Sequence, residues 1–239
     1  MSTIYNQLAK YYDDLVKDEE ATKEWVHWIC SFLKPSSILE LACGSGEITL
    51  ALADLGYKVD ALDISEEMVE KAANKDTDHR IHFMVRDMKD LLGLEKYDGI
   101  LCLCDSFNYL LSQEEVMTLF EQVYEHLNEG GLFFFDMHSL DRIEEFKEEF
   151  NETGQMEDGC QYQWSIMSED DIIYQDFAFY MPDGSCKQEH HMQKVFDPVW
   201  ILEMLSKYFS VISIKTDFVL EGIQEGEKYF YICEKRVVC

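Results

Sequence analysis

The feature that most constrains the fold is an alternation of short apolar segments with helical patterns between residues 36 and 137. Short apolar runs that lie between turn signals predict buried strands. Here they occur at residues 38–41, 58–63, 81–85, 97–104 and 132–136. Strands that alternate with helices predict a parallel sheet covered on both faces, in a doubly wound α/β fold.

Capping residues indicate where the helices of this segment begin and end. Ser65 is predicted to cap the helix that follows the second strand, because its hydroxyl can accept a hydrogen bond from the first turn. Ser112 and Glu115 have the spacing of a capping box, and Gly130 with Gly131 is predicted to end the helix behind it. Two further helices are expected before residue 35.

A different pattern begins after a helix that we expect at about residues 140–150. Polar and apolar residues alternate with a period of two, which is typical of an antiparallel sheet with one wet face. We interpret residues 151–197 as an inserted β lid on a main domain of residues 1–150 and 198–239. With a helix from residue 198 to about 208 and strands at 211–216 and 228–235, the main sheet is expected to be mostly parallel and seven-stranded.

Charge and composition exclude several classes of function. The chain has 20 Lys and Arg against 48 Asp and Glu, a formal net charge of −28, which disfavours a nucleic acid partner. Its start lacks a signal-peptide pattern, and no apolar run approaches the ~18 residues of a membrane span. The eight cysteines lack paired spacing. We therefore expect a cytosolic protein with reduced thiols and no membrane contact; the sequence carries no signal for its oligomeric state.

A glycine-containing loop is the main candidate for ligand binding. Gly44 and Gly46 lie where the first strand turns into a helix, so the backbone can approach a ligand closely. Asp63 ends the second strand, 19 residues after Gly44, where a carboxylate suits a ribose diol. A dinucleotide fingerprint requires a third glycine, but that position is Thr49. Glu40 at the strand end favours a cofactor with a positive charge over one with a pyrophosphate.

These segments resemble the motifs of class I S-adenosylmethionine-dependent methyltransferases. The resemblance covers Glu40 to Gly46, with Ala42 where a glycine is usual, and the second-strand segment from Ala61 to Ser65 with Met68. It continues through residues 85–88, 97–100 and 127–131 in the family's order. The position of the β insert is similar to that in amino-sugar N,N-dimethyltransferases and their bacterial relatives. The resemblance implies a Rossmann-like methyltransferase fold, S-adenosylmethionine as cofactor and a small-molecule acceptor.

The same resemblance implies roles for individual residues. Glu40 and Gly44 would lie by the methionine part, and Asp63 would hold the ribose hydroxyls. Ile64 and Met88 would enclose the adenine, with Asp87 on its exocyclic nitrogen. The implied cofactor-binding set is Tyr12, Glu40, Ala42, Gly44, Gly46, Asp63, Ile64, Met68, Asp87, Met88 and Cys104.

Four residues are candidates for catalysis: Tyr12, Asn108, Tyr109 and His138. Tyr12 belongs to a segment that resembles the family's cofactor-covering helix, and the other three follow strands four and five at the ligand-binding edge of such a sheet. Helix packing for Tyr12 and loop capping for Asn108 and Tyr109 are the competing interpretations. We expect a hydrogen-bonding role for His138 rather than a metal site.

The neighbouring histidines His190 and His191 are predicted to point to opposite faces of a strand, so at most one of them faces the site.

The hypothesis from sequence is methyl transfer to a small molecule, with an amine as the favoured acceptor. A non-catalytic protein that senses the nucleoside is one alternative, and an NAD-dependent oxidoreductase is another. A methyltransferase acting on protein or RNA is a third, although the charge suits RNA poorly.

Overall fold

The computed structural model describes residues 10–11, 15 and 18–236. Within them, the central sheet has eight strands in the order β11-β10-β12-β5-β4-β1-β2-β3. The first five strands along the chain pair in parallel, and β12 is antiparallel to both β5 and β10. The strands are β1 (Ser37–Leu41), β2 (Lys58–Asp63), β3 (His82–Val85), β4 (Tyr97–Cys102), β5 (Leu127–His138), β10 (Phe209–Thr216), β11 (Leu220–Glu221) and β12 (Lys228–Lys235).

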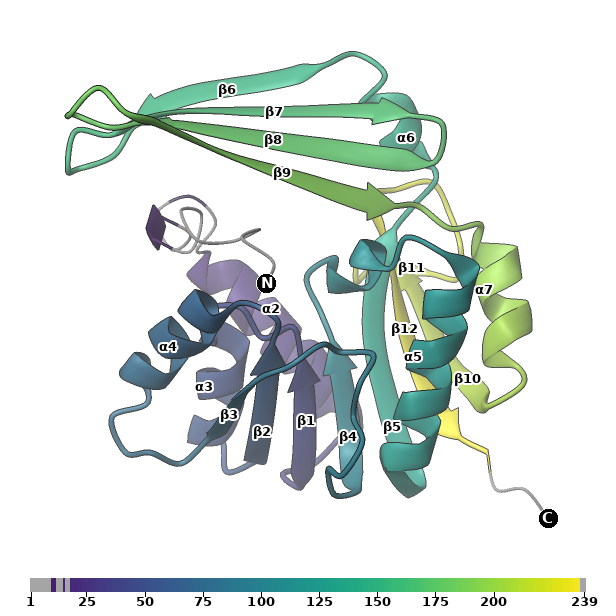
Figure 1. Cartoon of the computed structure of the whole chain (residues 1–239). Helices are drawn as coiled ribbons and strands as arrows, with labels where there is room; N and C mark the ends of the chain where they lie inside the picture. Colours follow the sequence, from purple (N-terminus) through teal and green to yellow (C-terminus); the bar gives the residue numbers. More distant parts are fainter. Residues whose placement is uncertain (1–9, 12–14, 16–17, 237–239) are drawn as a thin grey trace.

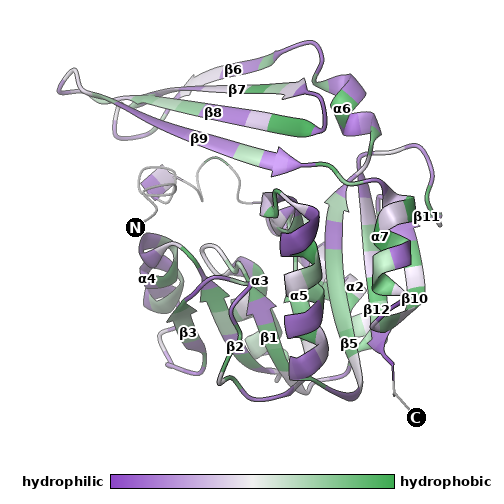
Figure 2. Ribbon diagram, turned by 45° about the vertical axis from the view of Figure 1, so that its right-hand side comes forward, coloured by the Kyte–Doolittle hydropathy of each residue, from purple (hydrophilic) through white to green (hydrophobic). Residues whose placement is uncertain are grey.

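Helices cover both faces of this sheet, as expected for a doubly wound fold. One buried cluster joins one face of the sheet to α5 and α7, and a second joins the opposite face to α2 and α3. Figure 2 shows the central strands coloured as hydrophobic along most of their length, because both faces are covered. The helical elements are α2 (Glu19–Phe32), α3 (Glu47–Asp54), α4 (Glu66–Lys75), η1 (Ser106–Tyr109), α5 (Gln113–His126), α6 (Asp141–Glu145) and α7 (Pro198–Leu205).

The predicted doubly wound α/β fold is confirmed, with three local corrections. The sheet has eight strands rather than seven, since the two-residue β11 is too short to leave a periodic pattern. Strand β5 begins at Leu127, before the two glycines, where the register with β4 shifts and Gly130 takes a positive φ of 72°. Helix α6 ends at Glu145, because the chain from Phe150 onward pairs with β7.

A separate antiparallel sheet follows, as the alternation predicted. Its strands, in the order β6-β7-β8-β9, are β6 (Phe150–Gln155), β7 (Gln161–Glu169), β8 (Ile172–Tyr180) and β9 (Cys186–Lys194). Figure 1 shows this sheet lying across the carboxyl ends of the parallel strands. Apolar side chains such as Trp164 and Phe177 point toward the central sheet, and His190 lies on the outer face with Asp176.

Three contacts fix the second sheet in place. The ring of Tyr11 stacks on Phe179 with 5.3 Å between centroids, and Lys10 forms an ion pair with Asp158 at 2.7 Å. On the other side, the Asn108 side-chain amide donates to the carbonyl of Lys194, at 2.7 Å. The space between the two sheets is therefore bounded at both ends. Among the described residues, no helix is long and apolar enough to cross a membrane.

Candidate active site

A cavity of about 530 Å³ lies between the carboxyl ends of the parallel strands and the inner face of the second sheet. Its volume is within the range of small-molecule sites. The second sheet contributes mostly apolar side chains, among them Trp164, Ile166, Ile173 and Phe177. The sequence-predicted site residues that line it are Ala42, Gly44, Asp63, Ile64, Met68, Asp87, Met88, Cys104, Tyr109 and His138.

Asp63 organises the glycine loop from the end of β2. Its Oδ2 accepts a hydrogen bond from the amide of Gly44, and its Oδ1 accepts one from the amide of Ser65, both at 2.9 Å. The side chain is 7% exposed, and burial raises the pKa of Asp63 although these backbone hydrogen bonds oppose the rise. The loop and the cap of α4 are thereby joined through one carboxylate at the cavity wall.

Gly44 and Gly46 are required to be glycine for different structural reasons. Both have positive φ, 54° at Gly44 and 83° at Gly46. Gly44 lines the cavity, and a Cβ there would meet no atom within 4 Å. Gly46 does not line the cavity, and a Cβ there would lie 2.9 Å from the Cβ of Ala72 in α4. Gly46 therefore serves the close packing of α3 against α4 rather than contact with a ligand.

Replacing Gly46 with alanine should lower the free energy of unfolding by about 2–4 kcal/mol, because the left-handed backbone and the contact with Ala72 are both unfavourable. Gly44→Ala meets no neighbour and should cost only about 1–2 kcal/mol. Urea unfolding of the two variants against the wild-type protein measures the difference. Equal losses for both variants would contradict this assignment.

Glu40 lies beneath the loop instead of facing the cavity. It is 3% exposed, and its Oε2 accepts a hydrogen bond from the Thr49 hydroxyl at 2.5 Å. Burial raises the pKa of Glu40 to about 7. The Glu40 carboxyl is therefore protonated at pH values below about 7. Thr49, which stands where a dinucleotide fingerprint would have its third glycine, is the hydrogen-bond partner of this carboxyl.

The folded protein keeps the Glu40 proton to a higher pH than the unfolded chain, which ionises near pH 4.3. The stability contributed by this group is thus fully present below about pH 4 and is lost as the pH rises to about 7. Relative to Glu40→Gln, the wild-type free energy of unfolding should fall by about 1.4 kcal/mol per pH unit between pH 5 and 7. Urea unfolding across this range checks the slope. Glu24→Gln, at an exposed position of α2, should follow the wild-type profile.

The side of the cavity nearest β2 and β3 forms an apolar slot with a carboxylate at its edge. Ile64, Met68 and Met88 provide its apolar surface. The Asp87 Oδ1 accepts a hydrogen bond from the amide of Lys89 at 2.8 Å, and Lys89 Nζ lies 3.7 Å from its Oδ2. An aromatic base could lie in such a slot with its polar edge toward Asp87.

A charged cluster occupies the opposite side, at the ends of β4, β5 and β12. Lys228 Nζ lies 2.7 Å from Asp105 Oδ1 and 3.7 Å from Asp136 Oδ2. Burial raises the pKa of Asp136 to about 8. Burial acts in the same direction on Asp105, but His138 and Lys228 outweigh it and hold the pKa of Asp105 well below its usual range. At neutral pH the cluster therefore contains one carboxylate, one neutral carboxyl and one ammonium.

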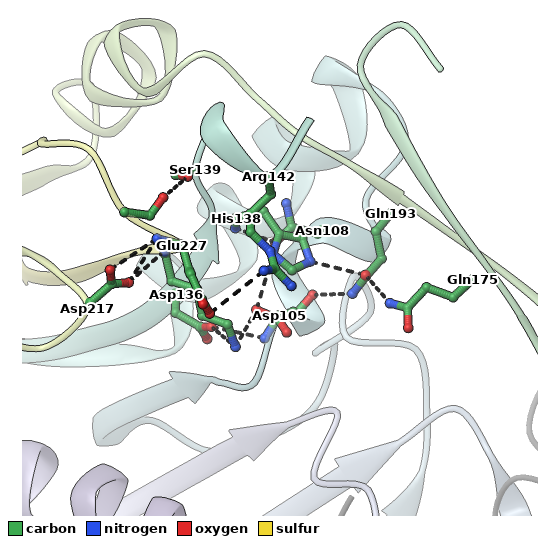
Figure 3. Close-up of polar contacts among 12 residues, drawn as sticks. Asp105, Asn108, Asp136, His138, Ser139, Arg142, Gln175, Gln193, Asp217 and Glu227 are labelled. Carbon is green, nitrogen blue, oxygen red and sulfur yellow. Dashed lines mark hydrogen bonds and ion pairs between the residues drawn. The ribbon is translucent and has the colours of Figure 1, made fainter. Parts of the chain in front are cut away.

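His138 is held inside a chain of polar contacts, drawn in Figure 3. Its Nε2 lies 3.1 Å from Gln193 Oε1, which also accepts from Gln175 Nε2 at 2.7 Å. Its Nδ1 lies 3.7 Å from Asp105. The ring is 4% exposed, and burial lowers the pKa of His138 although Asp105 opposes the change. The expected hydrogen-bonding role of His138 agrees with this placement.

One predicted catalytic residue, Asn108, does not line the cavity. Asn108 is fully buried, and in addition to its bond to Lys194 its Oδ1 accepts from the amide of His138 at 3.0 Å. Its side chain therefore holds η1 between β5 and β9, as in the loop-capping interpretation. Tyr12 lies outside the described residues.

Several cavity residues were not predicted from the sequence, and neither was the ion pair of Asp105 with Lys228. The resemblance to the family implied that the segment after strand four, which includes Asp105, would border the transferred methyl group. In the structure Asp105 follows Cys104 in a sharp turn where both residues have positive φ, 61° and 56°. Lys228 reaches the site because the antiparallel pairing of β12 with β5 places it opposite His138. Gln193 and Arg142 come from β9 and α6. No local sequence pattern distinguishes Gln193 or Arg142. For Lys228 one signal was available, a lysine at the first position of a buried strand.

Comparison with known proteins places this geometry in a family. The model of a methyltransferase domain matches residues 38–131. The protein named "Putative methyltransferase YqeM" from Bacillus subtilis (strain 168) is 32% identical over 97% of this chain and 97% of its own length. An S-adenosylmethionine-dependent methyltransferase from Clostridium acetobutylicum has a solved structure with a TM-score of 0.82 at 25% identity, covering 97% of this chain and 98% of that one. The chain belongs to the S-adenosylmethionine-dependent methyltransferases.

The fold of this methyltransferase is also shared with a sugar N-methyltransferase, KedS8 from Streptoalloteichus sp. ATCC 53650. The TM-score is 0.77 at 19% identity, with 99% of this chain and 94% of that chain covered. The family match sets aside an NAD-dependent oxidoreductase. It also makes S-adenosylmethionine the cofactor of the methyltransferase.

The cavity of the methyltransferase fits this cofactor. The Asp63 carboxylate, already held by two amides, suits a ribose diol, and the slot of Ile64, Met68 and Met88 suits an adenine. When bound, the cofactor supplies an activated methyl group on a sulfonium. The residues of the chain bind and orient the two reactants and exclude water, and positioning of this kind accounts for much of the rate in such displacements.

Proposed function

We propose that this methyltransferase transfers a methyl group to the nitrogen of a small-molecule amine. The observation that carries the proposal is the cover over the cavity: the inner face of the second sheet lies across the ends of β4 and β5. A macromolecular acceptor would need an open groove instead. Residues 151–197 would act as a substrate lid on a main domain of residues 1–150 and 198–239.

The choice of an amine as acceptor rests on the side chains that line the cavity, not on the net charge of the protein. Three carboxylates and four cationic side chains are found among the described lining residues, so the acidic surface does not continue into the cavity. Histidine, tyrosine and glutamine side chains are present, which can accept a proton from an ammonium group or hold it by hydrogen bonds. The sugar N-methyltransferase with the same fold supports nitrogen as the acceptor atom.

The proposed division of roles follows the two sides of the cavity. Asp63, Asp87, Ile64 and Met88 would bind the nucleoside, with Ala42, Gly44, Met68 and Cys104 around it. Tyr109 and His138 would face the acceptor, beneath the aromatic wall of the lid.

Calorimetric titration with S-adenosylhomocysteine, followed by mass spectrometry of a panel of acceptors, tests the proposal. The panel contains small primary and secondary amines, amino sugars and their hydroxyl counterparts. We expect micromolar binding and methylated products from amines only. Methylation of the hydroxyl compounds alone would overturn the choice of nitrogen. Tight binding with no product from any acceptor would favour the nucleoside-sensing alternative.

A further inference from the structure

Three side chains between η1 and β9 form a second line of polar contacts beside the His138 cluster. The Tyr109 hydroxyl lies 3.2 Å from His191 Nδ1, and Glu189 Oε2 lies 3.6 Å from His191 Nε2. Tyr109 and His191 line the cavity, whereas Glu189 lies behind them. His191 is 2% exposed and Glu189 is 7% exposed, so the line leads from the cavity into the protein.

The arrangement favours one tautomer of His191, through the charge of Glu189 at 3.6 Å rather than through a hydrogen bond. Glu189 and His191 are two residues apart on β9, so both side chains point to the same face of the strand. A carboxylate beside Nε2 favours a proton on that nitrogen and leaves Nδ1 as the acceptor. The Tyr109 hydroxyl can then donate to Nδ1. The ring of Phe177 packs edge-on against the imidazole, with 5.6 Å between centroids and 88° between planes, and fixes its orientation.

His138 is less suited to receive a proton from an acceptor. Its Nε2 faces Gln193, and its Nδ1 is buried on the side of Asp105. A contact through Nε2 would break its hydrogen bond with Gln193, and Nδ1 is buried without a hydrogen-bond partner among the described residues, so His138 can face the acceptor without being placed to take its proton. Tyr109, in contrast, lines the cavity and has a hydrogen-bond acceptor directly behind it.

We propose that Tyr109, His191 and Glu189 form the proton relay of the methyltransferase. The inference rests on the proposed function, because it requires an amine acceptor. The ammonium form of the acceptor gives a proton to the Tyr109 oxygen as the Tyr109 proton moves to His191 Nδ1, which leaves a neutral amine. The lone pair freed on nitrogen forms the new N–C bond, and the electron pair of the broken S–C bond stays on sulfur. The imidazolium is stabilised by Glu189 and later releases its proton to water.

In this relay Tyr109 is the catalytic residue, because it contacts the acceptor, and Glu189 acts as a positioning residue through His191. The titratable groups that face His191 among the described residues are Tyr109 of η1 and Glu189 of β9; β8 contributes the uncharged Phe177 and Gln175. His138 and Asp105 are the next ionisable groups, reached through Gln193.

The kinetic test compares Tyr109→Phe and His191→Gln with the wild-type protein, using the best amine from the panel above. Each variant should lower kcat by about 100-fold or more while the affinity for S-adenosylhomocysteine stays within about threefold. His190→Gln changes the next residue, on the outer face of β9, and should keep wild-type values. A drop in kcat below fivefold for both site variants would overturn the relay.

Nitrogen NMR of the imidazoles tests the relay without turnover. At pH 8 the spectrum should show His191 with its proton on Nε2, and Glu189→Gln should shift it toward a mixture of tautomers. A proton on Nδ1 of neutral His191 in the wild-type protein would overturn the relay, because Tyr109 could not then donate. If the panel yields no methylated amine but this spectrum is as expected, the proposed function fails while the relay geometry stands.

Discussion

Replacing Asp63 with alanine should weaken the binding of S-adenosylhomocysteine by at least about 100-fold, or about 2.7 kcal/mol. Two effects combine at this position. The variant loses the carboxylate that suits the ribose diol, and it also leaves the amides of Gly44 and Ser65 without their acceptor. The loop that lines the cavity then loses its fixed shape, so the effect should exceed that of one hydrogen bond. Isothermal titration calorimetry measures the affinity.

Asp60→Ala is the matched control for this experiment. Asp60 lies on the same strand, and its Oδ2 accepts a hydrogen bond from the Tyr97 hydroxyl at 2.7 Å, away from the cavity. The control should lose stability but keep wild-type affinity. An affinity within fivefold of wild type for Asp63→Ala would refute the assignment of the ribose site to this carboxylate.

The parts of the fold that the sequence predicted well are those determined by neighbouring residues. Strand β2 was predicted with its observed bounds, and the Ser65 and Ser112 caps accept hydrogen bonds from Met68 and Glu115 as expected. A strand, a turn and a helix cap each depend on a few consecutive side chains. The glycine loop and Asp63 were found for the same reason, since only 19 residues separate them.

The parts that were missed depend on pairing between distant segments. Gly130 and Gly131 end a helix in most local contexts, but here the pairing of Leu127 with Tyr97 draws them into β5. The candidate Asn108 is hydrogen-bonded to Lys194, 86 residues away, and no spacing rule predicts this contact. Likewise, His191 and Tyr109 come together only because β9 crosses above η1. The sequence can therefore identify a single candidate side chain such as Tyr109, but it cannot identify the distant residue that hydrogen-bonds to it.

The charged cluster of Asp105, Asp136 and Lys228 is the clearest example of contacts between residues that are distant in the sequence. Asp105 comes from the turn after β4, Asp136 from β5 and Lys228 from β12. Asp136 is fully buried, and the side chains of Asp105 and Lys228 are 22% and 24% exposed. Burial would lower the pKa of Lys228, but Asp105 and Asp136 raise it above its usual value. The ammonium therefore stays charged and compensates the Asp105 carboxylate.

Replacing Lys228 with methionine should lower the free energy of unfolding at pH 7 by about 2–3 kcal/mol, because the partly buried Asp105 carboxylate loses its counter-charge. The pKa of Asp105 is held below its usual range in the wild-type protein, so the stability from this pair is present above about pH 4 and is lost as the pH falls below that value. The difference between the two proteins should therefore shrink in acid. Urea unfolding at pH 7, 5, 3.5 and 2.5 measures it.

Lys215→Met provides a control with nearly the same exposure of the lysine side chain, 28% against 24%. Its partner Glu221 is 79% exposed, at 3.1 Å, and an exposed pair of this kind contributes less than about 1 kcal/mol. A second change, Asp105→Asn in the Lys228→Met background, should restore part of the loss, since the unpaired charge is then removed. If Lys228→Met costs no more than Lys215→Met at pH 7, the cluster does not hold an ionised Asp105, and the assignment of its charges is wrong.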